Sequence, residues 1–524
     1  MNESDGSRRG GLRAPLLILA VGGCLIAATY SLIRFNESNR FLAMSSSAGL
    51  TVIALYVWAM FFSGLRRATR RNLVLTTAAV IAGFFSLVKL EGCTGNNHPV
   101  FGWRWKEQPA LALRDELVRE DAKRVEVDLT DTTPDDSSQF LGPNRDARIE
   151  GVHLARDWSK NPPRLVWRHE VGKGWSSFAV VGDYAVTQEQ EQQREWTICY
   201  GKTTGDVCWA HDDPESFDSV IGGDGPRDTP TIDQGRVYTF GVLGRLNCLD
   251  GSTGSVLWTH SLLDKDAENF SKIFPEWGKS CSPLVTDKFV IVSRGLPEGH
   301  SLEAYDKLTG ELKWHAGDAP SAYDSPMLAT LGGVQQVVIV NRESVDGHDV
   351  ETGQHLWSFE WKGSEPKVPQ PIALGNDRLL VAAGYGLGTK LLEVTKTSEE
   401  WMVREIWAKR TLKPKFTNIV INDGVAYAID DGTALTCIDL KNGDRRWRGG
   451  RYGHGQILQA GDLLLVQAES GEVALVDATP EKCEELGRFP ALADKTWNEP
   501  TLSGKYLLVR NDREAACYEL PLAE

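Results

Sequence analysis

The sequence predicts an all-β fold, an eight-bladed β-propeller of four-stranded antiparallel blades, preceded by three N-terminal transmembrane α-helices. Three observations predict it: a phrase ending in Trp that recurs along the chain, a polar opening before each of a series of short strands, and three apolar runs near the N-terminus. The phrase reads DGSTGSVLW from Asp250, DKLTGELKW from Asp306, DVETGQHLW from Asp349 and DLKNGDRRW from Asp439.

The first 90 residues form the predicted membrane domain. Uncharged apolar runs at residues 15–33, 48–65 and 73–88 are each near the length that crosses a bilayer as a helix. Three such runs with short loops between them do not resemble one cleaved signal peptide. The alternative is three buried helices of a soluble domain. We expect the membrane to be one partner of this chain, through these helices.

Basic residues predict the orientation of the membrane domain. Arginines cluster before the first run and between the second and third, and the loop between the first and second holds only two. Because basic loops tend to stay in the cytoplasm, an odd number of crossings places the C-terminal propeller on the far side. We therefore expect a multi-pass protein of the bacterial inner (cell) membrane with an extracytoplasmic propeller, periplasmic in a Gram-negative cell. The arginines are Arg8, Arg9 and Arg13, then Arg34 and Arg40, then Arg66, Arg67, Arg70 and Arg71.

Residues 91–137 form a predicted linker between the bilayer and the propeller of residues 138–524. A short helix is possible at residues 110–124. The turn-rich acidic stretch DLTDTTPDDSS follows from Asp128. This composition is typical of a connecting segment.

The recurring phrase describes one hairpin of a blade. A strand ends at Asp, a tight turn takes Gly where φ is positive, and the next strand carries a Trp that can pack between neighbouring units. A looser copy, YGKTTGDVCW, begins at Tyr200, and degenerate copies include Trp407 and residues 477–489. The copies recur at roughly 37 to 56 residues, which is a blade length.

A second pattern counts the blades. Each unit opens with a small or polar residue, often followed by Pro, as in Thr229-Pro230 and Ser325-Pro326. A polar turn and a short strand follow each opening, and eight such strands predict eight blades. These turn-and-strand segments begin at Gly182, Gly235, Asp287, Val334, Asp377, Gly424, Gly461 and Gly504.

The two ends of the repeat region predict how the ring closes. The last strand, AACYEL at residues 515–520, has no Trp strand after it. RLVWRHEV at residues 164–171 has a Trp strand and no predecessor. Together they would complete one blade.

The charge is unevenly distributed along the chain. The net charge is −14, and residues 1–90 hold ten Lys or Arg against three Asp or Glu, so the remainder carries −21. A strongly acidic main domain argues against nucleic acid as a partner.

The repeats over residues 138–520 resemble the PQQ-binding-like β-propeller repeat proteins of the quinoprotein alcohol dehydrogenase-like superfamily, in particular membrane-anchored bacterial members. Stretches that carry the resemblance include FLGPNRDARIEG from Phe140, GDGPRDTPTI from Gly223 and PEWGKSCSPLV from Pro275. The resemblance implies the propeller fold. It leaves two functions open, because relatives include quinone-dependent alcohol and polyvinyl-alcohol dehydrogenases and also a lipoprotein scaffold of outer-membrane assembly.

The cofactor implied by the dehydrogenase relatives is pyrroloquinoline quinone (PQQ) with calcium, commonly held between a Trp and a Cys-Cys disulfide. None of the nine cysteines has a Cys neighbour, and no C-x-x-C-H haem motif occurs. No metal-ligand spacing appears either. The cysteines in the blades could form disulfides or remain buried thiols.

The candidate site residues lie just before the opening strands, because these segments converge on the propeller axis. We expect Arg227, Lys415 and Trp175 to be able to hold and cover a planar polycarboxylate, and Asp324 and Glu499 to bind a cation or act as a base. The alternative is an inert channel whose polar groups bond to one another and to water. The full set is Trp175, Arg227, Ser280, Asp324, Gln370, Lys415, His454 and Glu499.

The missing Cys pair and haem motif favour a membrane-anchored extracytoplasmic module that binds or scaffolds envelope proteins or a small-molecule ligand. The alternative is a PQQ-dependent alcohol dehydrogenase-type oxidoreductase with a variant cofactor site. It would use Asp324 or Glu499 as the base and a bound divalent ion.

Overall fold

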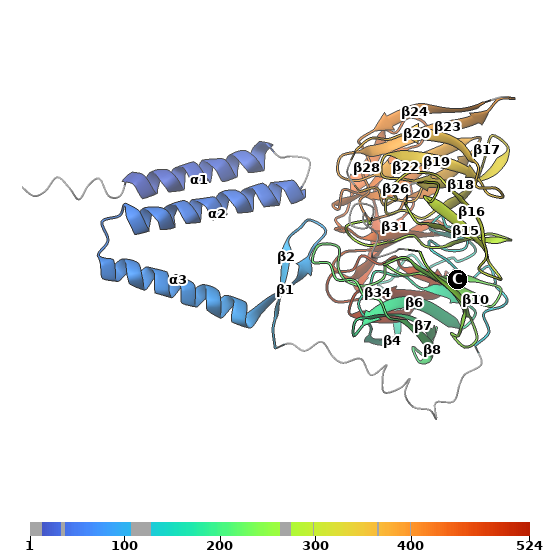
Figure 1. Ribbon diagram of the computed structural model, residues 1–524, viewed down its shortest axis with the longest axis horizontal. Helices are drawn as coiled ribbons and strands as arrows, with labels where there is room; N and C mark the ends of the chain where they lie inside the picture. The colour runs from blue at the N-terminus through green and yellow to red at the C-terminus, as the bar shows by residue number, and fades with distance from the viewer. Residues whose placement is uncertain are drawn as a thin grey trace, which may run out of the picture. The chain divides into compact units, whose positions relative to one another are not determined.

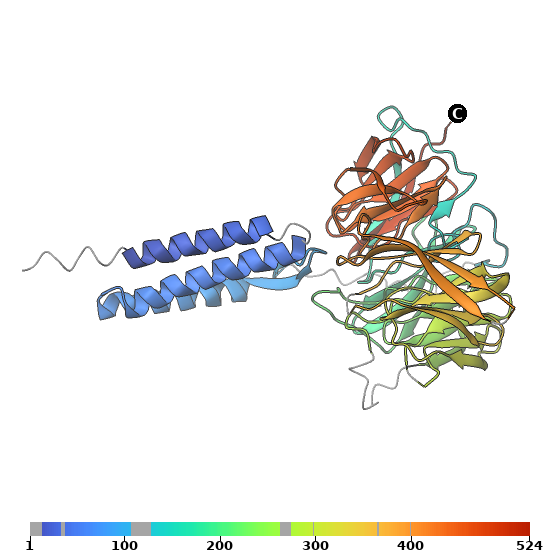
Figure 2. The same ribbon diagram turned by 90° about the horizontal axis from the view of Figure 1, so that it is seen from above.

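The computed structural model describes residues 13–32, 37–105, 127–262, 274–296, 298–363, 366–398 and 400–523. The chain forms two compact units (Figures 1 and 2). One contains residues 1–109 together with 220–222, and the other contains residues 110–219 and 223–524. The possible helix at residues 110–124 lies outside the described residues.

The first unit holds three helices and a hairpin. The helices are α1 (Arg13–Leu32), α2 (Glu37–Phe61) and α3 (Arg67–Leu87), and the hairpin strands are β1 (Val88–Cys93) and β2 (Pro99–Trp103). Helices α1 and α2 lie side by side (Figures 1 and 2) and approach closely at Gly22. A Cβ at Gly22 would stand 2.3 Å from Thr51 Oγ1.

The prediction of three transmembrane helices is wrong in one of the three. Among the described residues, only the segments Arg13–Ser31 and Arg40–Phe61 are long and apolar enough to cross a membrane. Helix α3 begins with Arg67, Arg70 and Arg71. The apolar stretch that remains is shorter than the roughly 20 residues that a spanning helix needs. The sequence pattern located the third helix, but its apolar run of residues 73–88 is too short to cross a bilayer.

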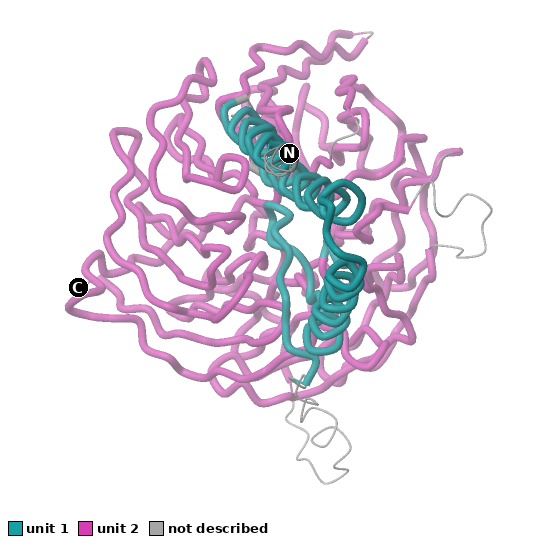
Figure 3. The backbone as a smooth tube through the Cα atoms, turned by 90° about the vertical axis from the view of Figure 1, so that its left-hand side faces the viewer, with its two compact units in different colours: residues 1–109, 220–222 teal, residues 110–219, 223–524 magenta. Residues whose placement is uncertain are grey.

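The second unit is the predicted eight-bladed propeller, and its backbone forms a ring around an axis in Figure 3. Blade 1 contains β5 (Ala179–Val181), β6 (Tyr184–Glu191), β7 (Arg194–Gly201) and β8 (Val207–Asp213). Blade 2 contains β9 (Thr231–Asp233), β10 (Arg236–Phe240), β11 (Arg245–Asp250) and β12 (Val256–Ser261). Blade 3 contains β13 (Leu284–Val285), β14 (Phe289–Ser293), β15 (Leu302–Asp306) and β16 (Leu312–Ala316). Blade 4 contains β17 (Met327–Leu331), β18 (Val334–Val340), β19 (Ser344–Asp349) and β20 (His355–Glu360).

The remaining blades repeat this antiparallel order. Blade 5 contains β21 (Ile372–Gly375), β22 (Arg378–Ala383), β23 (Gly388–Lys396) and β24 (Trp401–Lys409). Blade 6 contains β25 (Val420–Asn422), β26 (Val425–Asp430), β27 (Ala434–Asp439) and β28 (Arg445–Gly449). Blade 7 contains β29 (Gln456–Ala460), β30 (Leu463–Gln467), β31 (Glu472–Asp477) and β32 (Glu485–Pro490), with β3 (Arg148–Ile149) added in parallel to β29. Blade 8 contains β33 (Thr501–Ser503), β34 (Tyr506–Arg510), β35 (Glu514–Glu519) and β4 (Arg164–Glu170).

The predicted closure of the ring is confirmed in blade 8. Strand β4, from the start of the propeller, pairs antiparallel with β35, from its end, and Trp167 faces Cys517. Pairing the two ends of the repeat region in one sheet leaves the ring without an open blade.

The recurring Trp joins its blade to the next in six of the eight blades, whereas Trp357 of blade 4 bonds to Gln336 of its own blade. The indole N–H of Trp209 in blade 1 donates to Gly251 O in blade 2 at 2.8 Å, and that of Trp314 in blade 3 donates to Val350 O in blade 4 at 3.1 Å. Both acceptors lie in the Asp–Gly turn of the following blade. The other bonds of this kind run from Trp167 to Lys202 O, Trp258 to Lys307 O, Trp407 to Leu440 O and Trp447 to Thr479 O. We call these six Trp residues the rim tryptophans.

The glycine of each turn is required by the rim tryptophan that it contacts. Gly353 has φ +73°, and a Cβ there would lie 2.6 Å from Trp314 Cε3. Left-handed backbone and lack of space both exclude a side chain at this position.

Blade 7 lacks its own Trp and takes one from outside the repeats. Gly487 occupies the Trp position, and Trp158, from the segment before β4, lies beside it. Trp158 also packs edge-on against Phe489 at 5.6 Å between ring centroids.

Four cysteines are explained by the rim tryptophans. Cys199, Cys248, Cys437 and Cys517 are buried free thiols, each opposite a rim Trp on the neighbouring strand. Ala304 takes this position opposite Trp314. The position therefore needs a small apolar side chain, which Cys provides.

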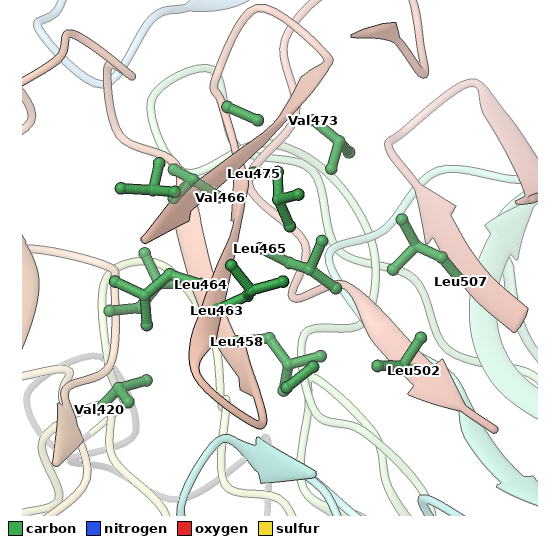
Figure 4. Close-up of a cluster of buried hydrophobic side chains, with 14 of the residues drawn as sticks. Val420, Leu458, Leu463, Leu464, Leu465, Val466, Val473, Leu475, Leu502 and Leu507 are labelled. Carbon is green, nitrogen blue, oxygen red and sulfur yellow. The ribbon is translucent and has the colours of Figure 1, made fainter. Parts of the chain in front are cut away.

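The core lies between the blades. Figure 4 shows the largest cluster, in which Leu463, Leu464 and Leu465 of β30 pack with side chains of β29, β31 and blade 8. All three are fully buried. Strands buried on both faces by flanking blades explain the unbroken apolar run in β30.

Candidate functional site at the propeller axis

The residues that open the innermost strands form a polar belt around the axis. Neighbouring blades are joined here through side chains, since Thr229 N donates to Ser282 Oγ and Ser282 N donates to Ser325 Oγ, both at 2.9 Å. Farther round, Asn418 Nδ2 donates to Glu499 Oε1 at 3.0 Å. The belt consists of Ser177, Thr229, Ser282, Ser325, Gln370, Asn418, Gln456 and Glu499.

In blades 2 and 4 the residue just before the belt position is an aspartate that supports its own blade. Asp324 Oδ2 accepts a hydrogen bond from Val340 N at 2.8 Å, and Asp228 accepts one from Phe240 N at 2.9 Å. Burial raises the pKa of Asp324 well above its ordinary value and that of Asp228 to about 7. Each carboxyl therefore holds the second strand of its blade, which is a structural role.

Two residues before the belt, aromatic side chains gather over the axis. Trp175 contacts Trp497 at 4.8 Å between ring centroids, and Phe416 contacts Trp497 at 5.3 Å and His454 at 5.0 Å. Tyr323 occupies the same position before blade 4. We call Trp175, Trp277, Tyr323, Phe416, His454 and Trp497 the aromatic mouth.

Trp277 extends the mouth across the axis. It lies before blade 3 and contacts Tyr323 at 5.3 Å and Phe416, before blade 6, at 6.5 Å. Trp277, Tyr323, Phe416 and Trp497 are partly exposed, and Trp175 and His454 are buried. The indole N–H groups of Trp175 and Trp277 have no hydrogen-bond acceptor among the described residues.

A lysine lies against the mouth. Lys495 Nζ is 4.2 Å from the ring centroid of Trp497 and 4.8 Å from that of Trp175. This geometry gives cation–π contacts to both indoles. The mouth thus combines aromatic surface with a positive charge.

The axis beneath the belt is filled by the chain itself. Residues 137–149, the axial plug, run from blade 8, where Ser137 Oγ donates to Leu502 O, to blade 7, where β3 joins the sheet. Arg145 is 4% exposed and its guanidinium donates to Ser282 O at 3.1 Å and Pro283 O at 3.0 Å. Gln370 Nε2 donates in turn to Arg145 O.

The space left between the plug and the belt is small. A cavity of about 10 Å³ remains, lined by side chains that include Gln139, Ser177 and Glu499. This volume suits about one water molecule. The space between the plug and the belt is therefore too small for a ligand larger than water.

The sequence-predicted candidates fall into different layers of this site. Trp175 and His454 belong to the mouth, and Gln370 and Glu499 belong to the belt. Asp324 lies between them and supports the second strand of its blade. Desolvation lowers the pKa of His454 to about 4, so its imidazole is neutral at physiological pH. Burial raises the pKa of Glu499 to about 8, so its carboxyl is mainly protonated. Ser280 Oγ donates to Tyr323 O at 2.6 Å.

The two candidate cations already have partners. The Arg227 guanidinium donates to Gly223 O at 2.6 Å and to Gly225 O, and lies 5.1 Å from the Phe217 ring centroid. Lys415 is buried, with Nζ 3.7 Å from Asp431 Oδ1 and 5.0 Å from the Tyr385 ring centroid.

The candidate set does not fit a calcium-bound quinone. A polycarboxylate would have to displace the protein partners of Arg227 and Lys415, and a protonated Glu499 is a poor calcium ligand. Among the described residues, no group of three or more His, Cys, Asp or Glu side chains is placed to hold a metal ion.

Sequence reasoning missed Trp277, Tyr323, Phe416 and Trp497, although a signal was present. Three of them lie two residues before a belt position, as Trp175 does. The candidate list mixed neighbouring positions, because Pro marks the register in only some blades. A difference of one or two positions in the sequence places a side chain in the mouth, in the belt or between them, where its role differs.

Comparison with protein families identifies the chain. Residues 193–448 and 341–482 match the family model described as outer membrane protein assembly factor BamB. Together the matches span 193–482, which is 290 of 524 residues. The chain belongs to this family. No curated protein sequence matches it significantly.

Solved structures similar to this BamB-family chain include alcohol and methanol dehydrogenases. A europium-containing methanol dehydrogenase has a TM-score of 0.56 and 12% identity, over 74% of this chain and 98% of that one. The quinohemoprotein alcohol dehydrogenase ADHIIG from Pseudomonas putida HK5 has a TM-score of 0.55 and 12% identity, over 75% and 81%. BamB from Moraxella catarrhalis has a TM-score of 0.49 and 16% identity, over 68% and 100%. At these identities the likeness extends to the propeller fold alone.

Proposed function

We propose that the chain is a membrane-anchored scaffold whose propeller binds an envelope protein partner at the aromatic mouth. One observation carries the proposal. Four partly exposed aromatic side chains meet over an axis that the chain's own plug fills from beneath. The family description, an outer membrane protein assembly factor, supports a protein as the partner.

The chemistry of the mouth suits a protein surface. Partly exposed Trp and Tyr supply large, stiff contact areas at small entropic cost, and such residues dominate binding energy at interfaces. The partly exposed ring of Trp277 supplies apolar contact surface at the centre of the mouth. Lys495 adds a site for an acidic or aromatic group beside Trp497.

We further propose that α1 and α2 anchor the chain in the membrane and that the propeller is extracytoplasmic. The two helices are nearly free of burial within the chain, which suits a lipid environment. The family description supports the envelope side. With two crossings the N-terminus lies on the same side as the propeller, so this proposal requires an extracytoplasmic N-terminus, in contrast to the cytoplasmic one that the basic residues predict.

A reporter fusion tests the membrane side. Alkaline phosphatase fused after residue 523 should be active in cells, and green fluorescent protein at the same position should be dark. The opposite pattern would place the propeller in the cytoplasm.

Site-specific photo-cross-linking tests the docking role. A benzophenone amino acid in place of Trp277 should cross-link the full-length chain in cells to one envelope protein. The matched control replaces Met402, which is 54% exposed on β24, away from the mouth. Equal cross-linking from both positions would contradict docking at the mouth.

A titration separates the quinone alternative from the scaffold. Pyrroloquinoline quinone with calcium, added to the detergent-solubilised chain in a calorimeter, should give no saturable heat. Saturable micromolar binding that weakens in Arg227→Ala would instead support the dehydrogenase function. The reason is that a guanidinium can pair with the carboxylates of the quinone through two hydrogen bonds.

A further inference from the structure

The β1–β2 hairpin is amphipathic. Leu90 pairs with Phe101 and Val88 with Trp103, and these side chains share one face. Leu90, Phe101 and Trp103 are 48%, 52% and 52% exposed. Trp105 follows, 62% exposed and stacked on Trp103 at 4.7 Å. Within the unit described, this apolar face is uncovered.

The other face of the hairpin is charged and closed. Lys89 Nζ lies 3.5 Å from Glu91 Oε1. The Glu91 carboxylate lies over Gly102, where a Cβ would stand 2.0 Å from Oε1. Only one face of the hairpin therefore offers apolar surface.

The hairpin is fixed to the end of α3. Val88 directly follows the helix, and its N–H donates to Phe84 O. From the other strand, Arg104 N donates to Leu87 O at 2.9 Å, and Arg104 Nε donates to Phe85 O at 2.8 Å. Phe84 also contacts Phe101 edge-on at 5.6 Å. The helix and the hairpin thus form one rigid element.

The exposed apolar surface continues from the helix onto the hairpin. No described residue of α3 is buried. Apolar side chains exposed on α3 include Leu75, Val80, Ile81, Phe85 and Leu87. A two-stranded hairpin with an uncovered apolar face is marginal in water, so this surface needs a partner.

We propose that the apolar face of the β1–β2 hairpin lies in the interfacial layer of the lipid bilayer. Trp and Phe favour this layer because their rings are apolar and the indole N–H can bond to headgroups or water. The charged face turns to water, and Lys89 and Arg104 favour anionic headgroups. Because the hairpin and α3 form one rigid element, the hairpin then fixes the depth and the tilt of α3 relative to the bilayer. This inference rests on the membrane anchoring proposed above.

Photo-cross-linking of the full chain in lipid tests the proposal. The chain is placed in nanodiscs of phosphatidylcholine and phosphatidylglycerol, with a benzophenone amino acid in place of Phe101. The matched variant carries it in place of Lys89, on the opposite face of the same hairpin. Lipid adducts found by mass spectrometry should be severalfold more abundant from position 101. Position 105 provides a second apolar-face probe if the change at position 101 prevents folding.

Two results would overturn the proposal. One is equal lipid adducts from positions 101 and 89, and the other is adducts from 101 to the propeller in place of lipid. Alkaline carbonate extraction of native membranes separates this failure from failure of the anchoring. A chain that resists extraction but gives no lipid adduct at 101 or 105 is anchored without an interfacial hairpin. A chain that is extracted is not anchored, and both proposals fail.

Discussion

The rim tryptophans and the tryptophans of the aromatic mouth are the same residue in two roles. At the rim, Trp314 is buried and its N–H bonds to Val350 O of the next blade. At the mouth, Trp277 is partly exposed and its N–H has no acceptor among the described residues. Burial alone does not separate the groups, because Trp175 of the mouth is only 9% exposed.

The difference shows how to distinguish structural from functional residues in a repeat protein. A rim Trp recurs at one position of the repeat and satisfies its hydrogen bond within the fold. The mouth tryptophans lie between repeats, and Trp175 and Trp277 have no acceptor for their N–H groups in the described chain, whereas Trp497 donates to Glu469 Oε1 at 2.9 Å. A buried or half-buried polar group left without a partner indicates a site for a ligand or water. Repetition with satisfied bonding indicates packing.

The largest expected effect breaks the comparison directly. Trp314→Ala should lower the free energy of unfolding by about 3–5 kcal/mol, since it leaves a cavity between two blades and an unpaired carbonyl. Trp277→Ala should cost roughly 1 kcal/mol or less, since the ring is partly exposed. Chemical denaturation of the full chain in detergent measures both. Similar losses from the two changes would mean that the mouth is part of the core.

A glycine pair sharpens the account of the rim. Gly353 and Gly333 both have φ +73°, but a Cβ at Gly353 meets Trp314 at 2.6 Å and one at Gly333 meets nothing within 4 Å. In both variants the alanine must adopt a left-handed backbone conformation, which lowers the free energy of unfolding. Gly353→Ala should lose about 1–3 kcal/mol more, because Trp314 must shift. Equal thermal midpoints for the two variants would show that the turn conformation, not the Trp contact, requires glycine.

The smallest effect concerns pH and distinguishes the axis from the rim. Burial raises the pKa of Glu499 to about 8. The folded chain therefore keeps a proton that the unfolded chain releases above about pH 4.5, and this contribution to stability is lost as pH rises toward 8. Glu499→Gln keeps the Oε1 acceptor for Asn418 and removes the titration. Relative to the parent chain, the variant should gain about 1.4 kcal/mol for each pH unit from about pH 5 to 7.

Denaturation at several pH values checks this prediction. The rim variant Trp314→Ala provides the control, because it should shift stability equally at every pH. A stability–pH profile of Glu499→Gln that is parallel to the parent profile would contradict a protonated carboxyl in the belt.

Much of the fold was predictable because the same short sequence patterns recur in successive blades. The TG turn before Trp314, the eight openings and the closure through Trp167 each follow from turn chemistry or strand pairing. Helix α3 was wrongly predicted to cross the membrane. Arg67, Arg70 and Arg71 lie inside this helix rather than before it, which leaves too short an apolar stretch. The periodic pattern cannot fix helix ends to within a turn.

The site was less predictable because it depends on contacts between distant segments. Trp277 meets Phe416 across the axis, 139 positions along the chain. The axial plug comes from outside the repeats, and no local pattern places Arg145 beside Ser282. The repeated part of the sequence therefore predicts the propeller fold. The segments outside the repeats form the site, and only folding brings them together.

The most direct test of the docking account is the affinity of the propeller for the envelope protein that position 277 cross-links. The purified full chain, the double variant Trp277→Ala/Trp497→Ala and the surface control Met402→Ala are compared by surface plasmon resonance. The account predicts that the double variant weakens binding at least about 100-fold, as expected when two central aromatic anchors are lost. The control should bind as the parent does. Unchanged affinity of a folded double variant would contradict a binding role for the aromatic mouth.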